Sequence, residues 1–174
     1  MSLLRRLFIR DGLPEGATGP LADDERMLAS AALPGGGHLV ATSAGLWLPT
    51  PDDGPRRIGW HLVSKASWGG GGLLLVEAQE QEVVEGAVVL TDLPARRMRL
   101  GDPGRLPEVV HQRVTGSIRS RHHRKLPGGG AWFVQRKVPG HDGTLLQVRP
   151  DPGTDPAALR QVVADVALRL SASR

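Results

Sequence analysis

The sequence contains no cysteine. This absence excludes disulfide bonds, thiolate metal sites and a cysteine nucleophile in a single step. Long apolar runs are also missing, since the longest run of leucine and valine is Leu73–Val76, far too short to cross a bilayer. The stretch MSLLRRLFIR has arginines inside its apolar part, which is not the pattern of a secretory signal. We therefore expect a cytoplasmic chain without a transmembrane segment.

The common motifs of catalysis are missing as well. The glycine runs at 35–37, 69–72 and 128–130 lack the G-x-x-x-x-G-K-[ST] spacing of a phosphate loop, and hairpin turns explain them better. No serine stands in a G-x-S-x-G elbow. The one close pair of histidines, His122 and His123, would point to opposite faces of a strand and could not share a metal ion. We predict no catalytic residues, no metal site, no cofactor and no enzymatic activity.

Length and composition are those of an ordinary globular protein. The chain has 174 residues, of which 40% are hydrophobic and 23% charged, with a net charge of +4. Residues 1–20 read as an amino-terminal tail and linker, in which 2–9 has the pattern of a short amphipathic helix. Residues 21–174 are predicted to form a single domain.

The clearest pattern in the chain lies between His38 and Trp68. Period-2 alternation predicts a strand at 38–43, another at 46–48, and a third in which Ile58, Trp60 and Leu62 share one face. A turn at 43–45 joins the first two strands, with Gly45 free to adopt a positive φ. Pro51-Asp52-Asp53-Gly54-Pro55 supplies the next turn.

The segment VATSAGLWLP…RRIGWHLVSKASW resembles the opening strands of bacterial PH-like domains, in which V-x-T-x-x-[GR]-L precedes I-x-[WL]-x-x-[IV]. This resemblance implies a mainly β fold with α: a β-sandwich or partly open barrel of about seven or more antiparallel strands, capped by a C-terminal helix. PH-like domains mostly bind lipid headgroups, peptides or other proteins. The two loops that would hold a phosphoinositide, Pro34–Gly37 and Ser43–Gly45, contain no lysine or arginine, so the resemblance does not carry that site over.

The remaining elements follow from local patterns. We expect further strands at 26–33, 73–79, 83–91, 96–100, 119–126, 131–138 and 144–149. Helix is an alternative for 21–33, where Ala, Leu, Glu and Met dominate, but the resemblance favours a strand. Asp-Pro pairs at 102–103 and 155–156 each combine a capping carboxylate with a proline at the first helical position. They predict an inserted helix near 103–117 and a C-terminal helix with one apolar stripe.

Positive charge is most concentrated at 119–125, which carries four cationic side chains and two imidazoles. One interpretation is an edge strand protected by charge. The other is a surface that contacts anions, in which arginines bind phosphates and an aromatic side chain stacks on a base. The candidate residues for contact with nucleic acid or another anion are Arg119, Arg121, His123, Arg124, Lys125, Arg136 and Lys137. Arg56 and Arg57 form a secondary basic patch.

The sequence thus favours a non-catalytic PH-like adaptor domain that binds another protein, through an exposed strand edge or the groove beside the C-terminal helix. Binding of RNA, DNA or an anionic membrane surface through the basic strand 119–125 is the alternative.

Overall fold

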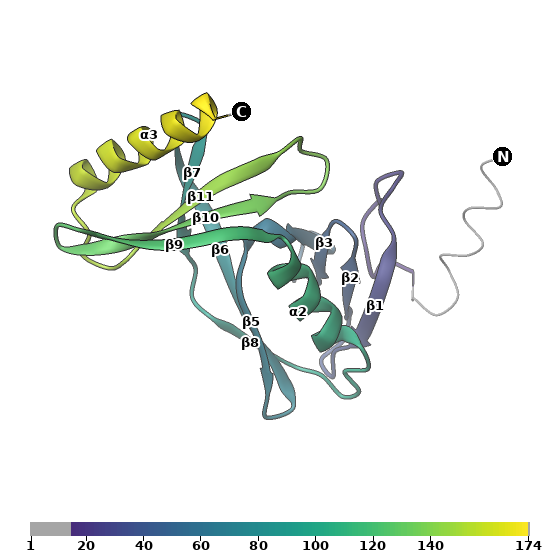
Figure 1. Cartoon of the computed structure of the whole chain (residues 1–174). Helices are drawn as coiled ribbons and strands as arrows, with labels where there is room; N and C mark the ends of the chain where they lie inside the picture. The colour runs from purple at the N-terminus through teal and green to yellow at the C-terminus, as the bar shows by residue number, and fades with distance from the viewer. Residues whose placement is uncertain (1–14, 174) are drawn as a thin grey trace. The chain divides into compact units, whose positions relative to one another are not determined.

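The computed structural model describes residues 15–173, so the amphipathic pattern at 2–9 lies outside the described residues (Figure 1). The described chain is mainly β, with two α-helices. It divides into two compact units. Unit 1 contains the described residues up to Val76 together with Ala95–Val114, and unit 2 contains Glu77–Pro94 and the residues from Thr115 onward. A single domain over 21–174 stays a prediction.

Unit 1 is built on an antiparallel sheet with the strand order β1-β2-β3-β4. Its elements are β1 (Met27–Ala32), β2 (His38–Thr42), β3 (Gly45–Leu48), β4 (Arg56–Gly59), the 3-10 turn η1 (Trp60–Leu62), β5 (Val63–Gly69), the first half of β6 (Gly72–Val84), β8 (Arg96–Arg99) and most of α2 (Leu106–Gly116). The predicted inserted helix is therefore confirmed. Apolar side chains from these strands and from α2 form one buried core around Trp60.

Unit 1 agrees with one expectation from the sequence and differs from two. The segment after residue 26 is a strand, as predicted, and not a helix. The strand expected to carry Ile58, Trp60 and Leu62 on one face is interrupted, because η1 turns the chain between β4 and β5. Gly45 is not among the glycines with a positive φ; it is required because a Cβ atom there would lie 2.3 Å from the carbonyl oxygen of Ile58.

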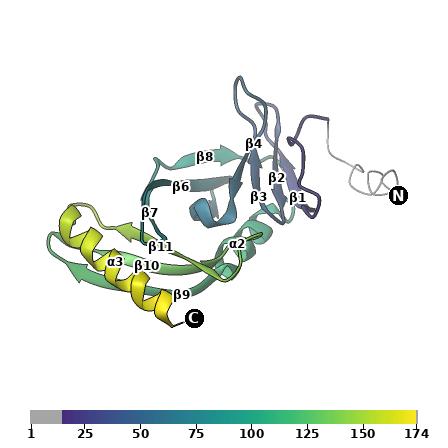
Figure 2. The ribbon, with the colours of Figure 1, turned by 90° about the horizontal axis from the view of Figure 1, so that it is seen from above.

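Unit 2 contains the second half of β6, β7 (Ala87–Asp92), β9 (Ile118–Leu126), β10 (Gly129–Lys137), β11 (Thr144–Pro150) and α3 (Pro156–Ala172). Its strands follow the order β6-β7-β11-β10-β9. In both Figure 1 and Figure 2, α3 lies across one face of this sheet. The predicted fold class, mainly β with a partly open barrel and a C-terminal helix, is confirmed. Membership of the PH-like class stays a prediction.

Two features of the unit 2 sheet differ from the sequence expectations. The strands are not all antiparallel, because β7 and β11 pair in parallel. The residues at 80–82 do not separate two strands; β6 runs through them with a bulge between Glu80 and Glu82. The turn to β7 comes later, at Glu85-Gly86, and all of Ala87–Leu90 is buried, as a strand covered on both faces requires.

The helix α3 forms for the reasons its sequence indicates. Asp155 is the N-cap, and its carboxylate accepts a hydrogen bond of 2.9 Å from the backbone N–H of Ala158. Leu159, Val163 and Ala167 are buried on one side of the helix. They pack in a second core with Phe133 and other apolar side chains of β7, β10 and β11. Burial of this stripe holds α3 on the sheet.

None of the helices in the described part of the chain is both long and apolar enough to cross a membrane.

Candidate functional site

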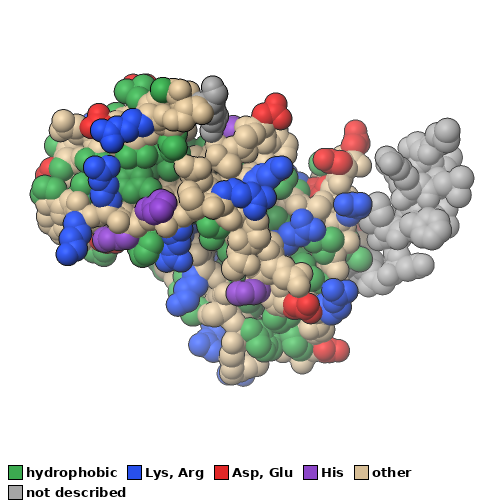
Figure 3. Space-filling view, viewed as in Figure 1, with side chains coloured by type: hydrophobic (Ala, Val, Ile, Leu, Met, Phe, Trp, Pro, Cys, Tyr) green, Lys and Arg blue, Asp and Glu red, His purple; other side chains and the backbone are tan. Residues whose placement is uncertain are grey.

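The strand β9 is the last in the strand order, so it is an edge strand, as the charge pattern predicted. It is nine residues long, and His122–Lys125 are all exposed. Figure 3 shows Lys, Arg and His side chains gathered along the path of β9 on the viewed face. In an antiparallel ladder, every second residue of an edge strand directs its backbone N–H and C=O away from its neighbour. A β9 of this length therefore offers a row of backbone groups to an added strand.

A tight turn fixes the β9–β10 hairpin. Leu126 lies opposite Gly129, which leaves Pro127 and Gly128 as the two loop residues. Gly128 has a φ of +81°, and a Cβ atom there would lie 2.2 Å from the carbonyl oxygen of Gly153. Only glycine meets both conditions. This turn sets the register that decides which β9 side chains share a face.

The register separates the basic side chains of β9 onto two faces. His123 lies opposite Trp132 and Arg121 opposite Val134, so these side chains share one face. His122 lies opposite Phe133, on the other face, which is the face that α3 covers. The two adjacent histidines therefore point apart, as expected for a strand. The described residues contain no group of three or more His, Asp or Glu side chains placed to hold a metal ion.

Trp132 organises the first of these faces. The guanidinium carbon of Arg121 lies 4.2 Å from the centroid of the Trp132 ring, a cation–π contact. The ring of His123 meets the same indole edge-on, with centroids 5.0 Å apart. His123 Nε2 is also 2.8 Å from a carboxylate oxygen of Asp151. These contacts hold Arg121 and His123 in place and cover part of the indole.

Arg136 and Arg149 are on β10 and β11, two central strands of the same sheet. Arg136 is only 3% exposed. Burial, together with the positive charge of Arg149, lowers the pKa of Arg136 to about 10. Burial also lowers the pKa of Arg149; Asp92, whose carboxylate is 3.8 Å away, opposes this shift and Arg121 adds to it. The Arg136 guanidinium is thus buried, whereas the Arg149 side chain is 18% exposed and reaches Asp92 at the surface.

The other candidate residues are placed differently. Arg119, Arg124, Lys125 and Lys137 are all exposed. Arg119 donates a hydrogen bond of 3.1 Å to the carbonyl oxygen of Gly116. The structure therefore brings Arg121 and His123 together around Trp132, leaves these four cationic side chains in solvent, and buries Arg136.

Sequence reasoning missed Arg149 and Asp151. Both belong to the chain from β11 onward, and Arg149 lies directly opposite Trp132 on β10. Alternation along β11 indicates the face of Arg149, but nothing in the sequence specifies which residue of β10 it meets. A register is needed to see that Trp132 has a basic neighbour on each side.

The secondary basic patch lies in unit 1, on β4. Arg56 and Arg57 are both exposed there. Arg57 donates a short hydrogen bond to the carboxylate of Glu25, and its guanidinium carbon is 5.6 Å from the ring centroid of Trp47. Half of this patch is therefore engaged by a buried carboxylate.

Comparisons with protein-family models, curated proteins and solved structures gave no match to this chain.

Proposed function

We propose that this chain is a non-catalytic adaptor domain, related to PH-like domains, that binds an extended acidic segment of another protein along β9. The observation that carries the proposal is the position of β9 at the end of the strand order, with nine residues. An edge strand of this length supports β-strand addition, in which backbone hydrogen bonds supply affinity and side chains supply specificity. Cytoplasmic location is part of the same proposal, and the lack of cysteine is compatible with it.

The charge of β9 supports an acidic partner. Arg119, Arg124 and Lys125 are exposed cations on the strand. A strand added beside β9 would place its side chains within reach of these residues on both faces. Carboxylates at alternate positions of the partner would complement them, whereas a basic segment would be repelled.

Binding of a nucleic acid or an anionic membrane surface is the second candidate, because the same cations can contact phosphates. The geometry around Trp132 supports it less. Base stacking needs an accessible aromatic face, and Arg121 lies 4.2 Å from the ring centroid. Asp151 also places a negative charge 2.8 Å from the His123 ring.

The test is recovery of a partner from the native host with the full chain as bait. Arg124→Glu with Lys125→Glu reverses the charge of β9 at two exposed positions and leaves the Arg121–Trp132 contact in place. We expect the wild-type protein to retain a stoichiometric protein after nuclease treatment, and the double variant to lose it. Hydrogen exchange of the complex should then show slower exchange at the β9 amides, because an added strand protects them.

Arg96→Glu with Arg97→Glu is the matched control, since both residues are exposed cations on β8, a strand of unit 1, and the change in net charge is the same. This control should bind as the wild type does. Recovery that disappears with nuclease would assign the surface to nucleic acid. A partner that binds the β9 double variant as well as the wild type would refute the proposal.

A further inference from the structure

The β5–β6 hairpin of unit 1 ends in a turn that carries no side chains. Gly70 and Gly71 are its two loop residues, with φ values of +60° and +73°. Positive φ at both positions is what a two-residue hairpin turn of type I′ requires. In the described part of the chain, no other atom lies within 4 Å of a Cβ atom built on Gly69 or Gly71. The turn is therefore open to solvent.

Trp68 lies next to this turn. At 41% it is the most exposed of the four tryptophans. A two-residue turn pairs Gly69 with Gly72, which places Trp68 opposite Leu73 on the same face of the hairpin. Leu73 belongs to the core of unit 1, but Trp68 does not. The hairpin thus presents an indole at its end.

Arg97 brings a positive charge to the same end of the hairpin. It lies on β8 opposite Leu74, so it is on the other face from Trp68. Because Gly72 has no side chain, the stem of Arg97 can cross β6 there, with its Cγ 3.6 Å from the position of a Gly72 Cβ atom. The guanidinium then reaches the turn, where Nη1 is 3.5 Å from the carbonyl oxygen of Gly69. An indole and a guanidinium therefore flank the turn from its two faces.

The charges around this end of unit 1 are all positive. Residues 63–76 and 95–101 contain no acidic residue and four cationic ones: Lys65, Arg96, Arg97 and Arg99. All four of these side chains are exposed. Figure 3 shows Lys and Arg side chains at the lower end of the view, where Figure 1 places β8 and the β5–β6 turn. This excess of four positive charges equals the net charge of the whole chain.

We propose that the end of the β5–β6 hairpin docks on the surface of a membrane that contains anionic lipids. The Trp68 indole then lies among the headgroups, where tryptophan is enriched because its ring is apolar and its N–H is polar. Arg97 and Arg99 are attracted by the negative surface potential, which is worth roughly fivefold in affinity for each cation. The site is separate from β9 and from the loops at 34–37 and 43–45.

The two faces of the hairpin favour a membrane over a nucleic acid. A flat surface that meets the hairpin end-on contacts Trp68 and Arg97 together, although they lie on opposite faces. A single strand of nucleic acid needs its stacking platform and its phosphate contacts along one groove. Bound along one face of the hairpin, it would contact either the indole or the guanidinium.

The test is co-sedimentation of the full-length protein with vesicles. Vesicles of phosphatidylcholine and phosphatidylserine in equal amounts should bind the protein, and vesicles of phosphatidylcholine alone should bind it much less. Arg97→Glu with Arg99→Glu should lower the partition coefficient on the anionic vesicles at least roughly tenfold. Arg124→Glu with Lys125→Glu, on β9, is the matched control because it changes the net charge equally, and it should stay close to wild-type binding.

Equal binding by these two charge-reversal variants would overturn the proposal. So would equal binding of the wild type to the two kinds of vesicle. Loss of binding in the β9 variant alone would move the membrane contact to β9 and would also overturn it.

Trp68 tests the apolar part of the contact. Anionic vesicles should shift the tryptophan emission of the wild type to shorter wavelength but leave that of Trp68→Ser in place. This variant should also bind at least roughly threefold more weakly. Leu168→Ser is the control, because Leu168 is an exposed apolar side chain on α3, and it should bind as the wild type does. The same emission shift in Trp68→Ser would contradict the docking of this indole.

Two soluble probes separate a membrane surface from other anions. Glycerophosphoserine should not displace the protein from anionic vesicles, and displacement would indicate a pocket for one headgroup instead. Binding of a single-stranded oligonucleotide that is lost in both the Trp68→Ser and the β8 variants would assign this site to nucleic acid and overturn the proposal. None of these results depends on a protein partner at β9, so failure here would leave the proposed adaptor function standing.

Discussion

Glu25 offers the sharpest test of how unit 1 is held together. Its side chain is 0% exposed, and its carboxylate accepts four hydrogen bonds. The donors are the backbone N–H of Ala22 at 3.1 Å, the Thr42 hydroxyl at 2.5 Å, the Trp47 indole N–H at 3.0 Å and the Arg57 guanidinium. This buried carboxylate ties the segment before β1 to β2, β3 and β4. We predict that Glu25→Gln destabilises the protein substantially.

The magnitude follows from the geometry. Glutamine keeps the shape of the side chain but replaces one acceptor oxygen with an NH₂ group, so donors that now bond to that oxygen would face another donor. Hydrogen bonds to charged groups contribute about 1.5–3 kcal/mol, and removing one partner of a buried ion pair costs about 3–5 kcal/mol. Arg57 is 37% exposed, so water compensates part of its loss. We expect a decrease of about 2–4 kcal/mol in the free energy of unfolding, or roughly 5–15 °C in Tm.

The assay is urea denaturation, monitored by tryptophan fluorescence. Trp47 is a direct probe of this site, because its indole N–H donates a hydrogen bond to Glu25. Asp24→Asn is the matched control. Asp24 is the exposed neighbour of Glu25, and its substitution should change stability by less than about 0.5 kcal/mol. A Glu25→Gln variant as stable as this control would refute the reasoning.

The same carboxylate should make stability depend on pH. Burial alone would raise the pKa of Glu25, but the hydrogen bonds from Thr42, Ala22 and Trp47 and the charge of Arg57 outweigh burial and hold the pKa below its ordinary value of 4.5. The folded state thus binds this proton less readily than the unfolded state does. The stabilisation is complete above pH 4.5 and is lost as pH falls through the folded-state pKa. The stability difference between wild type and Glu25→Gln should therefore shrink below pH 4.5 and stay constant near neutrality.

Two further predictions concern single positions. Asp155→Ala removes the N-cap of α3 and should lower the free energy of unfolding by about 0.5–2 kcal/mol, measured by urea denaturation. Asp155→Ser retains a capping oxygen and should lose much less stability. Equal losses in the two variants would contradict a capping role. Gly45→Ala places a methyl group 2.3 Å from the carbonyl oxygen of Ile58 and should lower the free energy of unfolding by more than about 1 kcal/mol in the same assay. Gly35→Ala, with no atom within 4 Å of the added Cβ, should change that free energy little. Similar stability of these two glycine variants would show that β3 and β4 can move apart at no cost in free energy.

Local patterns in the sequence were sufficient for most of the elements. Asp155-Pro156 and the apolar stripe of Leu159, Val162, Val163, Val166 and Leu170 predicted α3, because capping and helical periodicity involve residues within a few positions of one another. The charge on both faces of 119–125 predicted an edge strand, and β9 is one. The wrong prediction at 80–82 also arose from a local pattern. Glu80-Gln81-Glu82 resembles a polar turn, but a bulge in the ladder with β7 accommodates these residues within β6.

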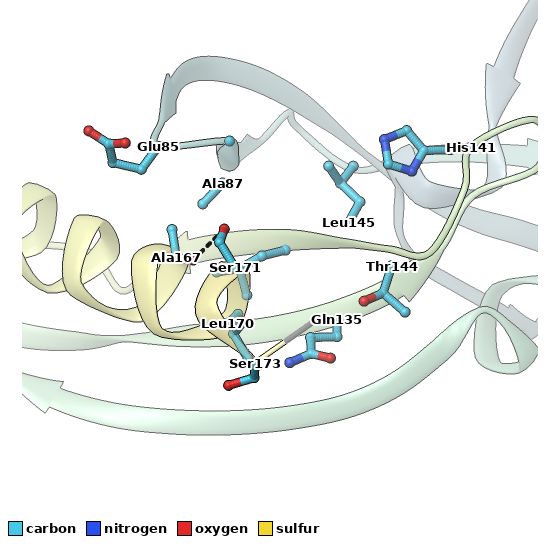
Figure 4. A pocket seen from close by; sticks show the side chains of 12 residues that line it. Glu85, Ala87, Gln135, His141, Thr144, Leu145, Ala167, Leu170, Ser171 and Ser173 are labelled. Atoms are coloured by element: carbon cyan, nitrogen blue, oxygen red, sulfur yellow. Dashed lines mark hydrogen bonds between the residues drawn. The ribbon is translucent and has the colours of Figure 1, made fainter.

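Only the tertiary structure decided the features that join residues far apart in the chain. The parallel pairing of β7 with β11, the burial of Glu25 beside Arg57, and the position of Arg149 opposite Trp132 all follow from strand order and register. Glu25 lies among exposed aspartates in the sequence, where a carboxylate is normally solvated, and its partner Arg57 is 32 residues away. Residues of the β6–β7 turn, β10, the β10–β11 loop, β11 and the end of α3 likewise line one pocket of unit 2 (Figure 4). Such contacts depend on how the whole sheet packs, so they cannot be read from the residues that are neighbours in the sequence.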